Sequence, residues 1–364
     1  MRILHCVPSL GPGGAERQLT YLAAEQVRGG HEVHVAVVSR GFFAERTESA
    51  GATIHQLRTG GGRDPRLLWR MYRLVGMLRP DVVHTRLPSM DILGGAVALA
   101  RRIPWVVSER SSDLAYARGA ASAVRAMLAR HATAIEANSA AGAAYWSGLK
   151  VGVPIFLNPP GLPLEAIAAA PVADPASLEL PRGSPLILFA GRFVAEKNVL
   201  LVLRALAQLF RETGAGAVLC GSGPQDAEAR ALAATLGIAD RVRFPGAIEE
   251  VWSWMKAAAV FIAPSIFEGR PNGVMEAAAA RCPLVVSEIP PHREFLDDRS
   301  ALFVPTDDSA AIAAALRQVV ESRAEAEARA ARAFETVSAF TFAAMTERVD
   351  AIYADVIRGR SDRR

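Results

Sequence analysis

Cysteine is scarce in this chain of 364 residues. The three cysteines, Cys6, Cys220 and Cys282, are far apart, and none belongs to a C-x-x-C motif or to a Cys/His cluster. A zinc site or a disulfide framework is therefore not expected, because the first needs clustered ligands and the second needs paired thiols. Free thiols are typical of a protein that works in the reducing cytoplasm.

Long apolar runs are also missing. No run of 18 apolar residues occurs, so no transmembrane helix is predicted. The first two residues lead directly into ILHCV (3–7), which has the pattern of a buried strand and not of a signal peptide. We therefore expect a cytoplasmic protein that can also act at the inner face of the cell membrane.

The charge excess is small and has one sign. Hydrophobic residues make up 51% of the chain, which is enough for large cores and excludes a disordered protein. The formal net charge of +4 favours an anionic partner, which could be a membrane surface, a phosphorylated substrate or a nucleic acid.

Short β-rich runs alternate with helical patterns in both halves of the chain. The runs are apolar on both faces, which is typical of parallel sheets covered by helices. In the first half they are ILHCV (3–7), EVHVAVV (32–38), TIHQL (53–57), DVVHT (81–85), WVVSE (105–109) and AIEAN (134–138). In the second half they are LILFAGR (186–192), AVLCGSG (217–223), VRF (242–244), VFIAPS (260–265), LVVSE (284–288) and ALFV (301–304). Two further helices are predicted over 308–335 and 342–358.

A Pro-rich stretch, residues 153–185, separates the two halves and is predicted to be a linker with irregular structure. The predicted fold is α/β, with two facing Rossmann-like domains. We place the first domain at 1–163, the second at 164–340, and a helix that crosses back to the first domain at 341–364. Ligands of such sheets bind outside the carboxyl ends of the strands, so the cleft between the domains is the expected active site.

Glycines and cations follow several of these strands. After the first strand, Gly13 and Gly14 open a helix whose first amides can face a phosphate. The alternative is a glycine-rich turn without a ligand, since the pattern is not GxGxxG. After LILFA, Arg192 and Lys197 can neutralise a diphosphate leaving group, or they form a solvated surface pair. The turn GSGP (221–224) again allows the backbone to approach a ligand closely.

Two glutamates, Glu268 and Glu276, flank a short loop at the carboxyl end of VFIAPS. The loop residues are Gly269, Arg270, Pro271, Asn272 and Gly273. Amides at the start of the next helix suit a phosphate, and an ionised carboxylate is a strong acceptor for vicinal hydroxyl groups. A ligand with both groups is a nucleotide sugar. An acid pair that caps a helix is the alternative.

Four segments, in their order along the chain, resemble glycosyltransferase family 4, whose members have the GT-B fold. They are GGAERQ (13–18), GRFVAEKN (191–198), GSGP (221–224) and FEGRPNGVMEAAAARCPLV (267–285). The resemblance covers nearly the whole chain. It implies that Arg192, Lys197 and Glu268 are the catalytic residues, with the two cations on the diphosphate and Glu268 on hydroxyls of the donor sugar. It also implies that Glu276 binds the ribose hydroxyls.

The same resemblance assigns further donor contacts. Gly13 and Gly14 close over the donor, and the backbone around Arg243 and Phe244 contacts the base. The loop after Glu268, residues 269–272, lies against the donor. The final helix crosses back onto the N-terminal domain.

Members of this family retain the anomeric configuration and need no metal. The sequence has no Asp-x-Asp motif at a strand end; Asp297-Asp298 and Asp307-Asp308 are adjacent pairs. No metal and no cofactor are therefore expected, and the cations and helix-start amides must stabilise the leaving group. We expect a front-face displacement in which the departing phosphate helps to deprotonate the acceptor hydroxyl. The expected donor is a UDP-sugar.

The expected acceptor is a saccharide or a polyprenyl-diphosphate-linked saccharide, in the synthesis of surface polysaccharide or glycolipid. Many relatives have a histidine after the strand that corresponds to WVVSE, where this chain has Arg110. Arginine stays protonated and cannot be a base, but it can bind a phosphate. His84 is the other candidate for acceptor contact, and a packed strand-end histidine is its alternative.

Two basic amphipathic segments favour a membrane surface. RLLWRMYRLVGMLR (66–79) places leucines, a methionine and a valine on one helical face and four arginines around it. LAYARGAASAVRAMLARHA (114–132) is a second candidate. The alternative is a helix packed on the sheet with a solvated basic face.

Three other functions remain open from the sequence. A nucleotide-sugar epimerase would act on the donor without an acceptor. A nucleic-acid-binding protein is disfavoured, because no recognisable module is present and the net charge is modest. A catalytically inactive sensor of nucleotide sugars would keep the same loops.

Overall fold

The computed structural model describes residues 1–11, 13–57, 64, 66–110, 119–180, 183–248 and 251–361. The chain forms two compact units: unit 1 consists of Met1–Gly161 and Phe340–Arg364, and unit 2 of Leu162–Ala339. The first unit therefore ends at Gly161, where we placed the boundary at residue 163. The chain returns to unit 1 at Phe340, where we placed the C-terminal helix from residue 341.

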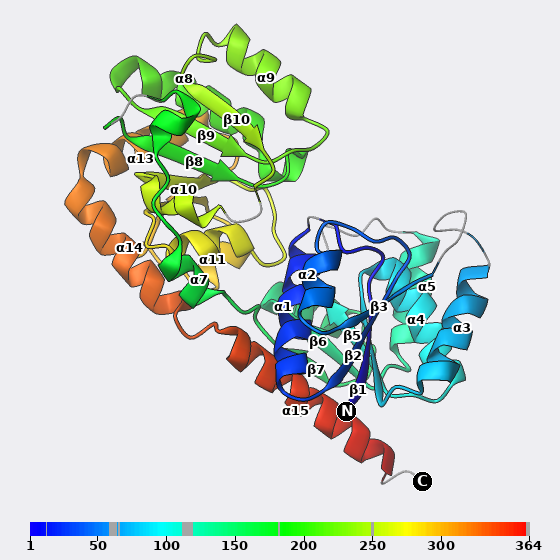
Figure 1. The fold of residues 1–364 in the computed structure, drawn as a ribbon. Helices are drawn as coiled ribbons and strands as arrows, with labels where there is room; N and C mark the ends of the chain where they lie inside the picture. Colours follow the sequence, from blue (N-terminus) through cyan, green and yellow to red (C-terminus); the bar gives the residue numbers. More distant parts are fainter. Residues whose placement is uncertain are drawn as a thin grey trace. The chain divides into compact units, whose positions relative to one another are not determined.

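Unit 1 is built on a sheet of seven parallel strands in the order β3-β2-β1-β4-β5-β6-β7 (Figure 1). The inner strands are buried and apolar because helices cover both faces of the sheet. The strands are β1 (Arg2–Cys6), β2 (Glu32–Val37), β3 (Thr53–Gln56), β4 (Val82–Arg86), β5 (Trp105–Glu109), β6 (Ala134–Ala137) and β7 (Ile155–Leu157).

Two sets of helices cover this sheet. On one face, buried residues of α3, α4, α5 and α6 share one core cluster with the strands. On the other face, α1, α2 and α15 form two further clusters, and α15 contacts α1 and β6. The bounds are α1 (Gly14–Arg28), α2 (Ala44–Ser49), α3 (Arg66–Leu78), α4 (Pro88–Ala100), α5 (Ala120–Ala129), α6 (Ala140–Gly148) and α15 (Phe342–Ser361).

Unit 2 has a sheet of six parallel strands in the order β10-β9-β8-β11-β12-β13 (Figure 1). Its strands are β8 (Leu186–Ala190), β9 (Gly216–Cys220), β10 (Val242–Gly246), β11 (Val260–Ala263), β12 (Leu284–Ser287) and β13 (Leu302–Val304). Its helices are α7 (Leu164–Ala169), α8 (Val199–Glu212), α9 (Asp226–Thr235), α10 (Trp252–Ala257), α11 (Asn272–Ala279), α12 (Pro290–Arg293), α13 (Ser309–Glu321) and α14 (Arg323–Val337).

The prediction of an α/β fold with two parallel sheets is confirmed, and two details of it are wrong. The stretch 153–185 contains strand β7 and helix α7, because a three-residue edge strand is too short to stand out beside so many prolines. The predicted helix over 308–335 is two helices. Asp308 caps α13 by accepting hydrogen bonds from Ala310 and Ala311, and Ser322, with ψ near 60°, interrupts the helical backbone before α14.

Counted from its own first strand, each sheet has the strand order 3-2-1-4-5-6, and the unit 1 sheet adds a seventh strand after the sixth. In such a sheet the connections leave in opposite directions from two neighbouring strands, and ligands bind beside that point at the carboxyl ends. The switch point lies between β1 and β4 in unit 1 and between β8 and β11 in unit 2. Among the helices that the structure describes, none has the length and apolarity needed to span a bilayer.

Candidate active site

The carboxyl ends of β8 and β11 bring two of the predicted catalytic side chains together. Lys197 ends a short 3₁₀ helix (Ala195–Lys197) after β8, and Glu268 follows β11. A cavity of about 30 Å³ lies between them and the start of α11, which is room for a water molecule or two. It is lined by Phe189, Ala190, Lys197, Phe261, Ala263, Ser265, Glu268, Pro271, Gly273 and Val274.

Lys197 and Glu268 form an ion pair of 2.5 Å between Nζ and Oε1, and their side chains are 24% and 10% exposed. The hydroxyl of Ser265 donates to the same carboxylate oxygen at 2.8 Å. Two donors therefore fix the orientation of Glu268. The pair places an ammonium and an acceptor side by side at the switch point, which is the charge arrangement that a diphosphate-linked sugar needs.

Arg192 lies apart from this pair. Its side chain is 64% exposed and forms an ion pair with Glu196, four residues along the chain, at 3.0 Å. This position agrees with the alternative of a solvated surface pair. Contact between Arg192 and a donor diphosphate stays a prediction.

Glu276 lies in the second turn of α11, which begins at Asn272. It is only 2% exposed, and one of its oxygens accepts a hydrogen bond of 3.0 Å from Nε1 of Trp252. The carboxylate is thus held by α10 beneath the start of α11. A contact with ribose hydroxyl groups stays a prediction.

The side chain of Arg270 points into the unit. It donates to Glu294 at 2.7 Å and lies over the ring of Phe295, and burial lowers the pKa of its guanidinium. Its charge is therefore used inside the protein, and only the backbone of Gly269 and Arg270 is left for a ligand. Asn272 is different, because its buried Oδ1 has no hydrogen-bond partner in the described part of the chain.

The two glycines of GSGP have an explanation that needs no ligand. A Cβ atom at Gly221 would lie 1.8 Å from the carbonyl oxygen of Gly191, and one at Gly223 would lie 2.5 Å from that of Phe193. Both glycines also have a positive φ, near 153° and 158°. The loops after β8 and β9 pack backbone against backbone here, which accounts for both glycines, and a close approach of this turn to a ligand stays a prediction.

Arg243 and Phe244 lie on β10. The guanidinium of Arg243 donates to the carbonyl oxygens of Leu178 at 2.7 Å and of Asp240 at 2.8 Å. It ties the segment before β8 to the sheet, and it leaves the backbone as the part that could meet a base. Phe244 packs edge-on against Phe193.

Gly13 and Gly14 belong to unit 1, where Gly13 caps α1 and Gly14 is its first residue. The φ of Gly13 is −95°, which any residue adopts. Among the described residues, the atoms nearest to a Cβ there belong to the movable carboxylate of Glu16. The local backbone thus does not require glycine at position 13, and closure over a donor stays a prediction.

His84 and Arg110 meet at Glu136, a residue of β6. The Nη2 atom of Arg110 donates to both carboxylate oxygens, at 2.9 and 2.6 Å, and Nε2 of His84 lies 3.5 Å from one of them. His84 is 1% exposed and bonded to the hydroxyl of Tyr353 at 2.6 Å. Burial, and then the charge of Arg86, lower the pKa of His84 to about 3. This agrees with the alternative of a packed histidine.

Glu136 is the residue that sequence reasoning missed. It is fully buried and also accepts hydrogen bonds from Ser108 at 2.6 Å and Asn158 at 2.8 Å. Burial raises the pKa of its carboxyl group, but the neighbouring Arg110 and the other donors outweigh burial, so the pKa lies far below its ordinary value. The signal was a glutamate at the centre of the apolar strand AIEAN.

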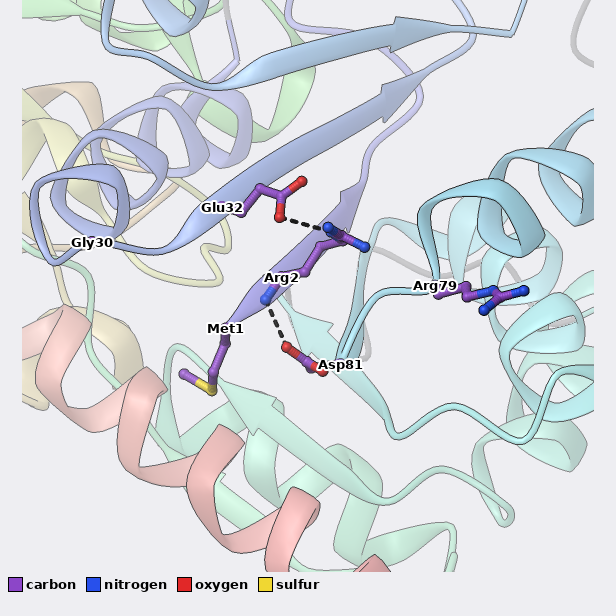
Figure 2. A pocket seen from close by; sticks show the side chains of 6 residues that line it. All are labelled: Met1, Arg2, Gly30, Glu32, Arg79 and Asp81. Carbon is purple, nitrogen blue, oxygen red and sulfur yellow. Dashed lines mark hydrogen bonds and ion pairs between the residues drawn. The ribbon is translucent and has the colours of Figure 1, made fainter.

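An open polar hollow of about 460 Å³ lies at the amino ends of the unit 1 strands, on the side of the sheet away from the carboxyl ends (Figure 2). There Arg2 bonds to Glu32 through Nε at 2.8 Å and to Asp81 through its backbone N–H at 2.7 Å. The hollow sits at the amino ends of β1 and β2. Ligands of parallel sheets bind at the carboxyl ends, so this hollow is not our candidate site.

Known proteins resemble the chain in both units. Residues 12–166 match the family model described as Glycosyltransferase Family 4, and residues 173–336 match that of Glycosyl transferases group 1. A lipopolysaccharide core biosynthesis glycosyltransferase, LpsE of Rhizobium meliloti, is 30% identical over 48% of this chain and 51% of that protein. A D-inositol 3-phosphate glycosyltransferase of Corynebacterium diphtheriae is 30% identical over 49% of this chain and 44% of that protein. The chain thus spans about half the length of these curated relatives.

A solved structure supports the fold. The crystal structure of HepE from Anabaena, in complex with UDP and glucose, aligns with 98% of this chain and 100% of its own, with a TM-score of 0.87 and 18% identity. The likeness to this structure shows the GT-B fold. The two family models, matched in succession over most of the chain, show that it belongs to glycosyltransferase family 4.

Proposed function

We propose that the chain is a retaining glycosyltransferase that moves a sugar from a UDP-sugar to a saccharide or a lipid-linked saccharide, in the synthesis of surface polysaccharide or glycolipid. The observation that carries the proposal is the Lys197–Glu268 pair beside the start of α11 at the switch point of unit 2. Family membership and the printed name of LpsE, which concerns the lipopolysaccharide core, support it.

The residues divide the work as follows. The ammonium of Lys197 and the first amides of α11 stabilise the diphosphate as it leaves. Glu268, held by Lys197 and Ser265, accepts hydrogen bonds from donor-sugar hydroxyls. Glu276 binds the ribose. The departing phosphate takes the acceptor proton, and no divalent cation is required.

UDP is expected to raise the melting temperature of the chain more than GDP does. A ligand that binds only the folded state stabilises it by an amount that grows with its concentration over Kd. Glu276→Gln keeps an acceptor for Trp252 but loses the ionised carboxylate, so its UDP shift should fall while its melting temperature without ligand stays close to that of the parent. A shift with GDP-mannose and none with any UDP-sugar would overturn the choice of donor. An equal UDP shift in the variant would overturn the role of Glu276.

An activity assay distinguishes the proposed transferase from an epimerase and from an inactive sensor. The epimerase converts the donor sugar without an acceptor, and the sensor binds the donor without turnover. Transfer to an added saccharide or lipid-linked saccharide is the result that supports our proposal against both.

We also propose that α3 lies on an anionic bilayer. Most of the apolar face predicted from the sequence, namely Leu67, Met71, Leu74 and Val75, is buried on the sheet, as the alternative had it. The surface proposed for the membrane is the outer face, which exposes Leu68 by 50%, Trp69 by 57% and Met77 by 70%, and on which Arg73 stacks on Trp69. The helix contains no acidic residue, so an apolar face with a cationic rim meets the solvent. In the second predicted segment, residues 114–118 lie outside the described residues, and α5 exposes Met127 by 56%.

Flotation with lipid vesicles tests this surface. The parent should float with vesicles that contain phosphatidylglycerol and much less with phosphatidylcholine alone. Trp69→Glu with Met77→Glu should abolish flotation, because charge at both positions opposes insertion. Val172→Glu, at a residue that is 67% exposed in unit 2, is the matched control and should float as the parent does. Equal flotation of the α3 variant would show that this helix does not bind the membrane.

A further inference from the structure

Arg86 is a buried cation with few partners. It is the last residue of β4, beside β1 at the switch point of unit 1, and it is 1% exposed. Its Nη1 bonds to Nδ1 of His5 at 2.9 Å, while Nε and Nη2 have no partner in the described part of the chain. The next residue, Leu87, has a φ of 70°, which is unusual for a side chain of this size.

The charge around Arg86 is not balanced. Among the described groups whose charges act most strongly on it, Glu136 is the one carboxylate, and Arg110 opposes it. Glu136 is already bonded twice to Arg110, whose Nη1 has no partner either. Two guanidinium groups therefore share one carboxylate. Burial, and then the charge of Arg110, lower the pKa of Arg86 to about 10, so Arg86 remains cationic at neutral pH.

Arg125 is a second buried arginine of unit 1, and its charge is paired within the protein. It is 2% exposed, close to the value for Arg86, but it is bonded to Asp91 at 2.7 Å and to Glu109 at 2.9 Å. The two arginines are thus similarly buried, but Arg125 is bonded to two carboxylates, whereas no carboxylate of the described residues is bonded to Arg86. Arg86 shares its nearest carboxylate with Arg110, and a buried charge that is only partly compensated is costly, so the free donors of Arg86 point to a missing anion.

We infer that Arg86 and Arg110 form an oxyanion subsite at the switch point of unit 1, and that it takes a phosphate group of the acceptor. The inference rests on the proposed function, because it names a feature of the acceptor. Guanidinium N–H groups match the oxygens of a phosphate in pairs, and several donors remain free here. The position suits a ligand, since parallel sheets bind at this point.

Thermal unfolding in phosphate and in chloride at equal ionic strength tests the subsite without any donor or turnover. Phosphate should raise the melting temperature of the parent by on the order of 2–4 °C at several times its Kd. Arg86→Met should be more stable than the parent in chloride, because a buried charge that is only partly compensated is removed, and it should lose most of the phosphate shift. Arg86→Lys keeps the charge but not the paired donors, so it should fold and show a reduced shift.

Arg125→Met is the matched control. It should be less stable than the parent, because Asp91 and Glu109 lose their partner, while its phosphate shift stays unchanged. Phosphate binding at Lys197 would be the same in all these proteins, so the difference between parent and Arg86 variants measures the subsite. Equal phosphate shifts in the parent, Arg86→Met and Arg86→Lys would overturn the inference, whatever their stabilities.

Glucose 1-phosphate separates an acceptor phosphate from a free ion. The parent should show an Arg86-dependent shift with this ester as well as with inorganic phosphate. A shift with inorganic phosphate alone would overturn the assignment to the acceptor. A protein that shows both shifts and transfers no sugar would refute the proposed function and leave the subsite intact, so the two failures are distinguishable.

Discussion

Replacement of Lys197 by alanine is expected to lower kcat by about 10²–10³ and to change the donor KM much less. Negative charge builds on the diphosphate as the sugar bond breaks, so a cation aimed at it stabilises the transition state more than the bound donor. The ammonium is held 2.5 Å from Glu268 and is largely shielded from solvent, which makes its charge effective. Initial rates of sugar transfer, measured in EDTA, give kcat and KM separately.

Two arginine variants serve as a comparison and a control for this experiment. Arg192→Ala should lower kcat as well, and the double variant should lose less than the sum if both cations act on one diphosphate. Arg293→Ala removes a surface cation of unit 2 that pairs with Glu288 and Asp298, and it should leave kcat unchanged. A folded Lys197→Ala protein with the kcat of the parent would show that the leaving group is stabilised elsewhere. A strict need for added Mg²⁺ would refute the metal-free mechanism.

Strand periodicity predicted most of the fold because each run is apolar on both faces and is bounded by a turn. WVVSE (105–109) coincides with β5, and the other long runs differ from their strands only at the ends. Strand β7 was not predicted, because three residues are too few to show the alternation of a strand and its side chains are only partly buried. The break between α13 and α14 at Ser322 was not predicted either, because residues of high helix propensity, alanine, glutamate and arginine, occur on both sides of it.

The candidate site was only partly predictable. Lys197 and Glu268 lie 71 positions apart, and strand order alone brings their loops together, so the meeting of two strand ends could be foreseen. The direction of each side chain could not. The sequence does not show that Arg270 turns inward to Glu294, or that the glycines of GSGP serve loop packing.

Glu136 illustrates a second limit of sequence reasoning, since its partners come from strands β4 and β5 and from the residues that follow β5 and β7. A change to glutamine there is expected to destabilise the protein by about 3–5 kcal/mol, because Arg110 and Arg86 then lose their carboxylate. The loss should appear as a lower urea midpoint with little change in slope. Glu347→Gln, at an exposed position of α15, is the control and should stay within about 0.5 kcal/mol of the parent.

The pH dependence of the free energy of unfolding tests whether the negative charge of Glu136 stabilises the protein. The folded-state pKa of Glu136 is depressed, so its contribution is complete above the ordinary carboxyl pKa of about 4.3 and is lost as the pH falls from there toward the folded-state value. The parent should therefore lose its stability advantage over Glu136→Gln in acid, where the other carboxylates act equally on both proteins. The double variant Glu136→Gln with Arg110→Met should recover part of the loss, since it removes the charge that the glutamate compensates. A constant difference between parent and Glu136→Gln from neutral pH into acid would show that shape and hydrogen bonding, and not the charge, make Glu136 necessary.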